Sequence, residues 1–177
     1  MFTHSEKFFK SFNSLINFIM DEFHTVKPSV LECHFFPNLD NEAKVVNMIR
    51  TCKKTLDIAI FTLTNDKIFA GIEEAFNRGV NIRVIADDEC CKMMGSDIIR
   101  CAALGIPVKT DSDVKAHMHH KFCVLDNSVL ITGSFNWTVQ AVKQNQENIL
   151  FYENRELAAK YTAEFNRLWN LFTAVVE

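Results

Sequence analysis

Apolar residues recur at helical spacing near the start of the chain, between residues 6 and 24. This pattern predicts an amphipathic helix whose apolar face packs on the domain core or contacts a membrane surface or partner. Its apolar run, residues 8–20, is interrupted by lysine and asparagine and is shorter than the roughly 20 residues that span a bilayer. We therefore expect an N-terminal amphipathic helical segment over residues 1–27 and one globular domain over residues 28–177.

Strand-like apolar runs alternate with stretches of helical spacing from residue 30 onward. We predict strands at residues 30–36, 56–63, 80–86, 106–110, 118–125, 128–132 and 148–152. We predict helices at residues 42–53, 66–77, 96–105 and 155–175. This alternation favours an α/β fold with a mixed, mostly parallel central sheet flanked by helices on both faces. The Asp126-Asn127 pair predicts one antiparallel hairpin within that sheet.

The composition fits a single folded domain. Hydrophobic residues make up 48% of the chain, which excludes disorder, and 5 Gly and 3 Pro exclude a collagen-like or low-complexity chain. The net charge of −3 supplies no global basic field, so any phosphate binding must be local. The 6 cysteines lack the close-spaced pairs of a zinc site. We expect them to be reduced thiols in an intracellular protein.

Three of the 6 histidines lie within residues 117–120. In an extended chain His117, His119 and Lys121 share one face, with neighbours about 6.5 to 7 Å apart. An imidazole and an ammonium at that spacing can contact two sides of one phosphate. Neutral imidazole can act as a nucleophile, lysine can neutralise non-bridging oxygens, and imidazolium can protonate a leaving oxygen. His120 faces the other way, and we expect it to be a core or supporting residue.

Further polar residues follow at the ends of the next predicted strands. Ser134 and Asn136 lie at a strand-to-helix turn, where they offer short hydrogen-bond donors to a phosphate. Glu147 begins the last strand and can hold a histidine ring by its second nitrogen. Each of these residues is weak evidence when taken alone.

Together these residues spell H-x-K-x-x-x-x-D, followed by G-S-x-N and a glutamate. This pattern resembles the HKD signature of the phospholipase D superfamily. Longer stretches, including Phe61-Thr62-Leu63 and Asn136-Trp137-Thr138, resemble the mitochondrial cardiolipin hydrolase family, which includes the Zucchini endonucleases. The resemblance covers residues 30–172. The matching positions are His119, Lys121, Asp126, Gly133, Ser134, Asn136 and Glu147.

The resemblance implies a phospholipase D-like catalytic domain that hydrolyses phosphodiesters with no metal and no cofactor. It implies that His119 attacks phosphorus to form a phosphohistidine. Lys121, Ser134 and Asn136 would hold the non-bridging oxygens. Water would then release the phosphoryl group.

The resemblance also implies roles for the remaining motif residues and for a second copy of the chain. Asp126 resembles a residue that braces the motif, and Glu147 resembles the carboxylate that orients a histidine. Only one motif copy is present, whereas the superfamily's reaction uses two histidines. The resemblance therefore implies a homodimer with a shared active site, in which His119 of the second copy protonates the leaving alcohol.

The sequence departs from the family in two places. The family's Cys/His zinc-binding insertion is missing, because residues 36–40 pass directly from the first strand toward the first helix. The Phe-rich segment at residues 6–24 stands where the family has a membrane anchor. By resemblance we expect the outer surface of mitochondria, with peripheral membrane contact through residues 6–24, and a cytoplasmic location stays open.

The motif leaves the substrate open between single-stranded RNA or DNA and an anionic phospholipid such as cardiolipin. The polar and basic residues around His119 favour a single-stranded nucleic acid endonuclease. One rival is a metallohydrolase in which His117 and His119 join Asp87 or Asp126 around a metal ion, but this would aim Lys121 at the cation. The other rival, a non-catalytic interaction module, leaves the complete motif unexplained.

Overall fold

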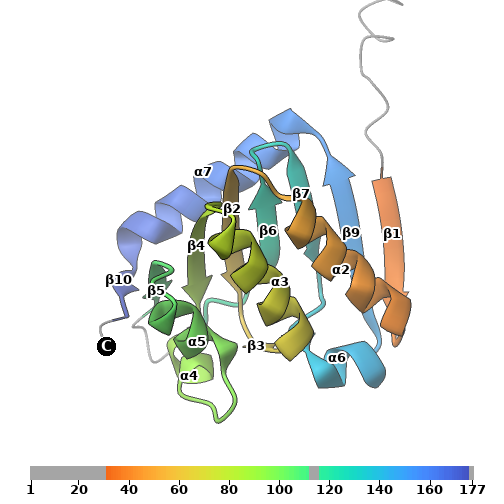
Figure 1. Cartoon of the computed structure of the whole chain (residues 1–177), viewed down its shortest axis with the longest axis horizontal. Coiled ribbons are helices and arrows are strands. Elements are labelled where there is room, and N and C mark those ends of the chain that lie inside the picture. Colours follow the sequence, from red (N-terminus) through yellow and green to blue (C-terminus); the bar gives the residue numbers. More distant parts are fainter. Residues whose placement is uncertain (1–30, 112–115, 176–177) are drawn as a thin grey trace, which may run out of the picture. The chain divides into compact units, whose positions relative to one another are not determined.

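The computed structural model of the chain describes residues 31–111 and 116–175, so the helix predicted at residues 6–24 lies outside the described residues. Its elements are shown in Figure 1. The strands are β1 (Leu31–Phe36), β2 (Thr55–Ile60), β3 (Leu63–Thr64), β4 (Asn81–Ala86), β5 (Val108–Thr110), β6 (Lys121–Leu125), β7 (Val129–Gly133), β8 (Trp137–Thr138), β9 (Glu147–Glu153) and β10 (Thr173–Ala174). The helices are α2 (Leu39–Thr51), α3 (Asp66–Asn77), α4 (Asp88–Cys91), α5 (Asp97–Ala103), α6 (Val139–Lys143) and α7 (Arg155–Leu171).

Eight strands form one mixed sheet in the order β1-β9-β7-β6-β2-β4-β5-β10. The mixed α/β class is confirmed, but the expectation of a mostly parallel sheet is wrong. Only β2-β4 and β4-β5 are parallel neighbours in this sheet, and the other five pairs are antiparallel. Parallel neighbours need a crossover, which here α3 supplies between β2 and β4 and α4 and α5 supply between β4 and β5. Strands β6 and β7 are joined by a hairpin, and β9 returns antiparallel to β7 after β8 and α6.

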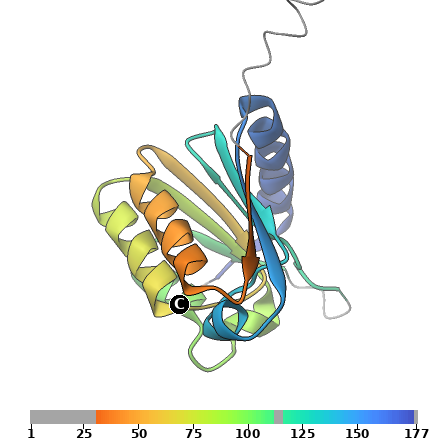
Figure 2. The same cartoon turned by 90° about the vertical axis from the view of Figure 1, so that its right-hand side faces the viewer.

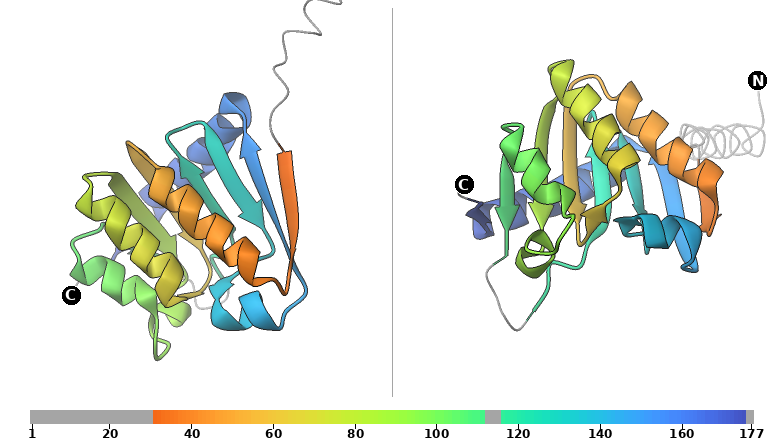
Figure 3. Two further views of the ribbon diagram at one scale, coloured as in Figure 1. Left: turned by 45° about the vertical axis from the view of Figure 1, so that its right-hand side comes forward. Right: turned by 60° about the horizontal axis from the view of Figure 1, so that its bottom comes forward.

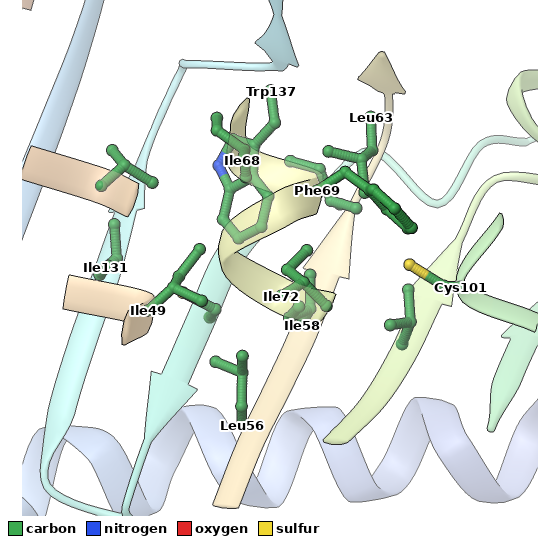
Figure 4. Close-up of a cluster of buried hydrophobic side chains, with 14 of the residues drawn as sticks. Ile49, Leu56, Ile58, Leu63, Ile68, Phe69, Ile72, Cys101, Ile131 and Trp137 are labelled. Carbon is green, nitrogen blue, oxygen red and sulfur yellow. The ribbon is translucent and has the colours of Figure 1, made fainter. Parts of the chain in front are cut away.

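Helices cover both faces of the sheet, as predicted. Helices α2 and α3 lie on one face, and α7 crosses the other (Figures 1 and 2). The larger core lies under α2, α3 and α5, and a second core lies under α7 around Phe122 and Phe165. In the larger core, Trp137 lies near Leu63 and Ile68 (Figure 4), and its side chain is only 2% exposed.

The predicted hairpin forms between β6 and β7, which pair in antiparallel register from Phe122 opposite Thr132 to Leu125 opposite Val129. Asp126 and Asn127 occupy its turn with φ angles of 51° and 54°. Two successive residues with positive φ are typical of a type I′ turn, which suits the right-handed twist of paired strands. Asp and Asn are among the few residue types that tolerate this conformation.

Helix α2 begins directly after β1. Asn38 caps α2 by accepting a hydrogen bond from the backbone N–H of Asp40 at 2.8 Å. The structure therefore contains no inserted element between β1 and α2, in line with the sequence. Helix α3 has its predicted bounds, whereas β6 begins at Lys121 and not at residue 118. The short elements α4, α6, β3, β8 and β10 were not predicted, because two to five residues are too few to show a period.

One edge of the sheet gathers the polar ends of several strands. Strand β2 ends opposite the start of β6, where Ile60 pairs with Lys121, and β7 ends beside the start of β9, where Gly133 pairs with Ile149. Helices α4 and α6 lie along this edge (Figure 3). Among the described residues, no helix has the length and apolar composition needed to cross a membrane.

Candidate active site

His119 and Lys121 meet at this edge, as the alternation predicted. Lys121 Nζ lies 3.2 Å from Nδ1 and 3.4 Å from Nε2 of His119, and it donates to the His119 carbonyl at 2.8 Å. His119 is exposed, whereas Met118 and Phe122 point into the core under α7. The predicted nucleophile and its neighbouring cation therefore lie side by side and open to substrate.

Both groups are biased toward their neutral forms. Burial lowers the pKa of His119, and the positive charges of Lys121 and His117 lower it further. Burial also lowers the pKa of Lys121, while the Glu147 carboxylate opposes that shift. A neutral His119 ring has the free lone pair that attack on phosphorus requires.

Ser134 is fixed between the end of β7 and the start of β9. Its backbone N–H donates to the Asn148 carbonyl at 3.1 Å, and its Oγ accepts from the Asn148 N–H at 3.1 Å. Gly133 makes this approach possible, because a Cβ at that position would collide with the Asn148 carbonyl. The close packing of β7 on β9 therefore requires the glycine of the Gly-Ser pair and fixes the serine, independently of any contact with substrate.

Glu147 joins the same cluster through other partners than the sequence suggested. It accepts hydrogen bonds from the Ser134 hydroxyl and, at 3.1 Å, from the Asn145 side-chain amide. Within the described residues it makes no hydrogen bond to a histidine of its own chain. Its orienting contact with a histidine therefore stays a prediction. In this chain Glu147 fixes Ser134 and partly offsets the lowering of the Lys121 pKa by burial.

Asn136 lies one turn further along, before β8. Its side chain is half-buried, and its Oδ1 is a buried atom without a hydrogen-bond partner. The predicted contact of Asn136 with a phosphate oxygen stays a prediction.

Asp126 is the one predicted site residue that lies elsewhere. It stands at the far end of β6, about 17 Å from Lys121 at the usual rise per strand residue. Its carboxylate accepts hydrogen bonds from the backbone N–H groups of Lys53, Lys54 and Thr55 at 2.9, 2.7 and 3.0 Å. These contacts fit the bracing role implied by the resemblance and place Asp126 away from the reacting atoms.

The two other histidines differ in their surroundings. His117 Nδ1 lies 2.9 Å from Oδ2 of Asp87, so the strand-end aspartate both caps α4 and pairs with a histidine. His120 points toward α7, where its Nε2 lies 3.7 Å from Glu164, and its side chain is 49% exposed. His120 is therefore not a core residue, and the other predicted possibility, a supporting role on the side of the chain away from the site, stays a prediction.

Potential metal ligands gather in two groups of described residues beside α4. Asp87, Glu89 and His117 form one group, and Asp87, Asp88 and Asp111 form the other, each with its ligand atoms within 4.8 Å of one another. Neither group contains His119. Asp87 accepts from two backbone N–H groups and pairs with the His117 ring, and neither group brings together His117 and His119 as the rival metallohydrolase requires.

Two hollows adjoin His119. One of about 360 Å³ is lined by Lys121, Thr132, Lys160 and Tyr161 among others. The second, of about 470 Å³, has more apolar walls, which include Met118, Leu168, Leu171 and Phe172. The site thus offers two approaches to the same imidazole, of which the second is the more apolar.

The family described as cardiolipin synthase, PLD-like domain, matches residues 45–169 of this chain. The chain belongs to this phospholipase D-like family. Among its relatives is the mitochondrial cardiolipin hydrolase of Chlamydomonas reinhardtii, with 38% identity over 140 residues that cover 79% of this chain and 62% of that protein. The enzyme of the same name from Mus musculus is 33% identical over 145 residues, covering 82% of this chain and 65% of that protein. The chain thus spans slightly under two thirds of each relative.

Solved structures of the phospholipase D-like family share the fold. Nuc from Salmonella typhimurium, a phospholipase D family member, superposes with a TM-score of 0.77 at 25% identity, covering 84% of this chain and 99% of that one. NucT from Helicobacter pylori superposes with a TM-score of 0.72 at 20% identity, covering 82% and 100%. The predicted phospholipase D-like fold is confirmed.

The roles of two residues at the site were missed from the sequence, which gave Phe61 no role and gave Asp87 only that of a metal ligand in the rival metallohydrolase. Phe61 contacts both His117 and His119 through its ring, and Asp87 holds His117. Asp87 was recognisable as a residue that follows a strand and caps the next helix. Its histidine lies 30 residues later in the chain, and no local pattern connects the two.

Proposed function

We propose that this phospholipase D-like protein is a metal-independent phosphodiesterase that works through a phosphohistidine. The observation that carries the proposal is the close approach of the Lys121 ammonium to the His119 ring, whose pKa burial and Lys121 lower. The His119 nitrogen attacks phosphorus, the bond to the leaving oxygen breaks, and that oxygen takes up a proton. Lys121, Ser134 and Asn136 hold the non-bridging oxygens. Water then cleaves the phosphorus–nitrogen bond and restores His119.

The second histidine of the reaction comes, in this proposal, from another copy of the chain. His119 lies exposed at one edge of the sheet, where a two-fold partner can bring its own His119 across the phosphorus. One ring must be neutral to attack and the other protonated to serve the leaving oxygen. The pair would therefore give a bell-shaped pH profile whose apparent pKa values belong to the pair.

The active species is expected to be a homodimer. Light scattering should give the mass of two chains wherever activity per chain is constant, and activity per chain should fall on dilution as the dimer dissociates. Adding an excess of inactive His119→Ala chains should also reduce the activity of wild-type chains through mixed dimers. A monomer that retains full activity per chain would contradict the shared site.

For the substrate we propose single-stranded nucleic acid. The hollow beside His119 and Lys121 carries the polar or basic side chains of Thr132 and Lys160 and the aromatic ring of Tyr161. Lysines next to aromatic rings suit a single strand whose bases stack without sequence readout. A duplex is roughly 20 Å across and would have to open before its backbone reached the site.

A cardiolipin hydrolase is the second candidate. It is favoured by the names of the two relatives and by the apolar walls of the second hollow, which would suit acyl chains. The same relatives support a mitochondrial location, for which we propose the outer surface, with peripheral membrane contact through residues 6–24.

One preparation assayed on four substrates separates the two candidates. We expect cleavage of single-stranded RNA and single-stranded DNA to products with a 5′-phosphate, little cleavage of duplex DNA, and a rate that falls steeply with salt. Because the attack uses a histidine and not the 2′-hydroxyl, both single strands should be cut. Release of phosphatidic acid from cardiolipin vesicles without cleavage of either strand would reverse the choice.

A further inference from the structure

His117 is a second imidazole at the site, and the proposed reaction does not use it. Its Nδ1 lies 2.9 Å from Asp87 Oδ2, and the Asp87 side chain is buried, whereas the His117 side chain is half-exposed. Asp87 also accepts hydrogen bonds from the backbone N–H groups of Glu89 and Cys90 at 3.1 and 3.0 Å. The start of α4 thus fixes the carboxylate, and the carboxylate fixes the ring.

The contact also sets the charge of both groups. Burial raises the pKa of Asp87, but the N–H group of Cys90 and the His117 ring outweigh it and leave the pKa below its usual value. The hydrogen bond to Asp87 is the largest cause that raises the pKa of His117. In mildly acidic solution the pair is therefore an imidazolium held on a carboxylate.

Phe61 brings this pair next to the nucleophile. It follows β2, and its backbone N–H donates to the His120 carbonyl at 2.9 Å. The His117 ring meets the Phe61 ring edge-on at a centroid distance of 5.8 Å, and the His119 ring packs against it at 4.5 Å. Lys121 Nζ lies 4.9 Å from the centre of the same ring. The rings of His117 and His119 and the ammonium of Lys121 therefore all contact the Phe61 ring.

We propose that His117, held by Asp87, is a positioning residue for His119, whose ring it keeps neutral and nucleophilic in mildly acidic solution. The effect of His117 on the charge of His119 does not depend on a substrate. Only its effect on catalysis rests on the proposed function of the site.

Charged groups face both rings from several elements. Those around His119 are His117 and His120 of its own segment, Lys121 of β6, Asp87 at the start of α4, and Lys160, Glu164 and Arg167 of α7. Those around His117 are Asp87, Glu89 and Asp111. Besides burial and Lys121, the charge of His117 lowers the pKa of His119 more than Asp87 raises it.

The size of the effect follows from the spacing. Side chains two residues apart in an extended chain lie about 6.5 to 7 Å apart. A unit charge at that distance shifts a pKa by about 0.5 to 2 units, between the dielectric of water and that of a protein surface. Because His117 is exposed, solvent screening places the expected shift near the lower end.

The test is a histidine titration by NMR on the full chain labelled with ¹⁵N-histidine, with the His119 signals assigned from His119→Gln. In His117→Gln the positive charge is lost while Asp87 stays ionised, so the pKa of His119 should rise by about 0.5 unit or more. In Asp87→Asn the side-chain oxygen that caps α4 is kept, whereas the negative charge is lost. His117 still becomes protonated over the pH range in which His119 titrates. The pKa of His119 should then stay the same or fall.

His34→Gln is the matched control. It removes an imidazole paired with Glu32 at 3.0 Å and should leave the pKa of His119 unchanged.

Opposite responses to the two substitutions support a charge effect. A His119 pKa that stays fixed in His117→Gln, or that rises equally in both variants, overturns the proposal, since equal rises indicate a general loosening of the site. The titration needs no turnover, so it stands if the proposed reaction fails. With active enzyme, the acidic limb of kcat/KM for His117→Gln should move to higher pH.

Discussion

His119→Ala is expected to lose phosphodiester hydrolysis by at least about 10³-fold, because the variant lacks the nitrogen that attacks phosphorus. The side chain is exposed and its ring packs on Phe61 at the surface, so the thermal midpoint should change little. Steady-state rates on single-stranded oligonucleotides and on bis(p-nitrophenyl) phosphate, together with thermal unfolding, measure both effects.

The neighbouring residue supplies a matched control. His120→Gln also removes one imidazole from this segment, but on the side of the chain that faces α7, and it should keep most of the activity. Wild-type activity should survive EDTA, since the reaction needs no metal. If His119→Ala retained more than a few per cent of the rate, or if added zinc restored an activity lost in EDTA, the assignment of the nucleophile would be wrong.

Asp126→Ala is expected to act on stability and not on chemistry. The substitution leaves three backbone N–H groups without their acceptor, so the free energy of unfolding should fall by about 2 to 4 kcal/mol. Asn tolerates the positive φ at this position and keeps one acceptor oxygen, so Asp126→Asn should lose less. Urea unfolding measures both losses, and kcat measured well below the unfolding midpoint should stay near the wild-type value.

The pH dependence of unfolding checks the same assignment. Burial raises the pKa of Asp126, but the N–H groups of Thr55, Lys53 and Lys54 outweigh it and leave the pKa below its usual value. The stabilisation is therefore complete above about pH 4, the unfolded pKa, and is lost as the pH falls through the lower folded pKa. The difference between wild type and Asp126→Ala should shrink over that acidic range. An Asp126→Ala protein of full stability and low kcat would instead make Asp126 a catalytic residue.

The sequence was sufficient to predict those elements whose structure depends on neighbouring residues in the chain. Helix α3 has its predicted bounds because a capping Asn65 and a clear apolar period define it, and the Asp126-Asn127 turn marked the hairpin. Alternation also placed His119 and Lys121 on one face. The direction of most strand pairs was missed, because pairing depends on long-range neighbours that alternation of strands and helices does not specify.

In the site, too, residues linked by the motif spacing could be predicted from the sequence, whereas residues brought in by long-range strand pairing could not. Ser134 and Glu147 meet because β7 and β9 pair in the sheet, and the motif spacing already linked them. Phe61 and Asp87 reach the site from the ends of β2, which pairs with β6, and β4, which pairs with β2, and these places in the sheet were not visible in the sequence. Long-range contacts of this kind are what a single sequence leaves open.

In the strand order β9-β7-β6-β2-β4, the reacting groups lie on β6, β7 and β9 or beside them, whereas the residues around them come from the ends of β2 and β4. The motif residues come from one continuous stretch of chain that folds into adjacent strands, while Phe61 and Asp87 come from the first half of the chain. Sequence change in that half can therefore alter the acidity of the nucleophile while every motif residue stays the same. Two proteins with identical motifs can thus differ in working pH, and an engineer can adjust that property without replacing a reacting group.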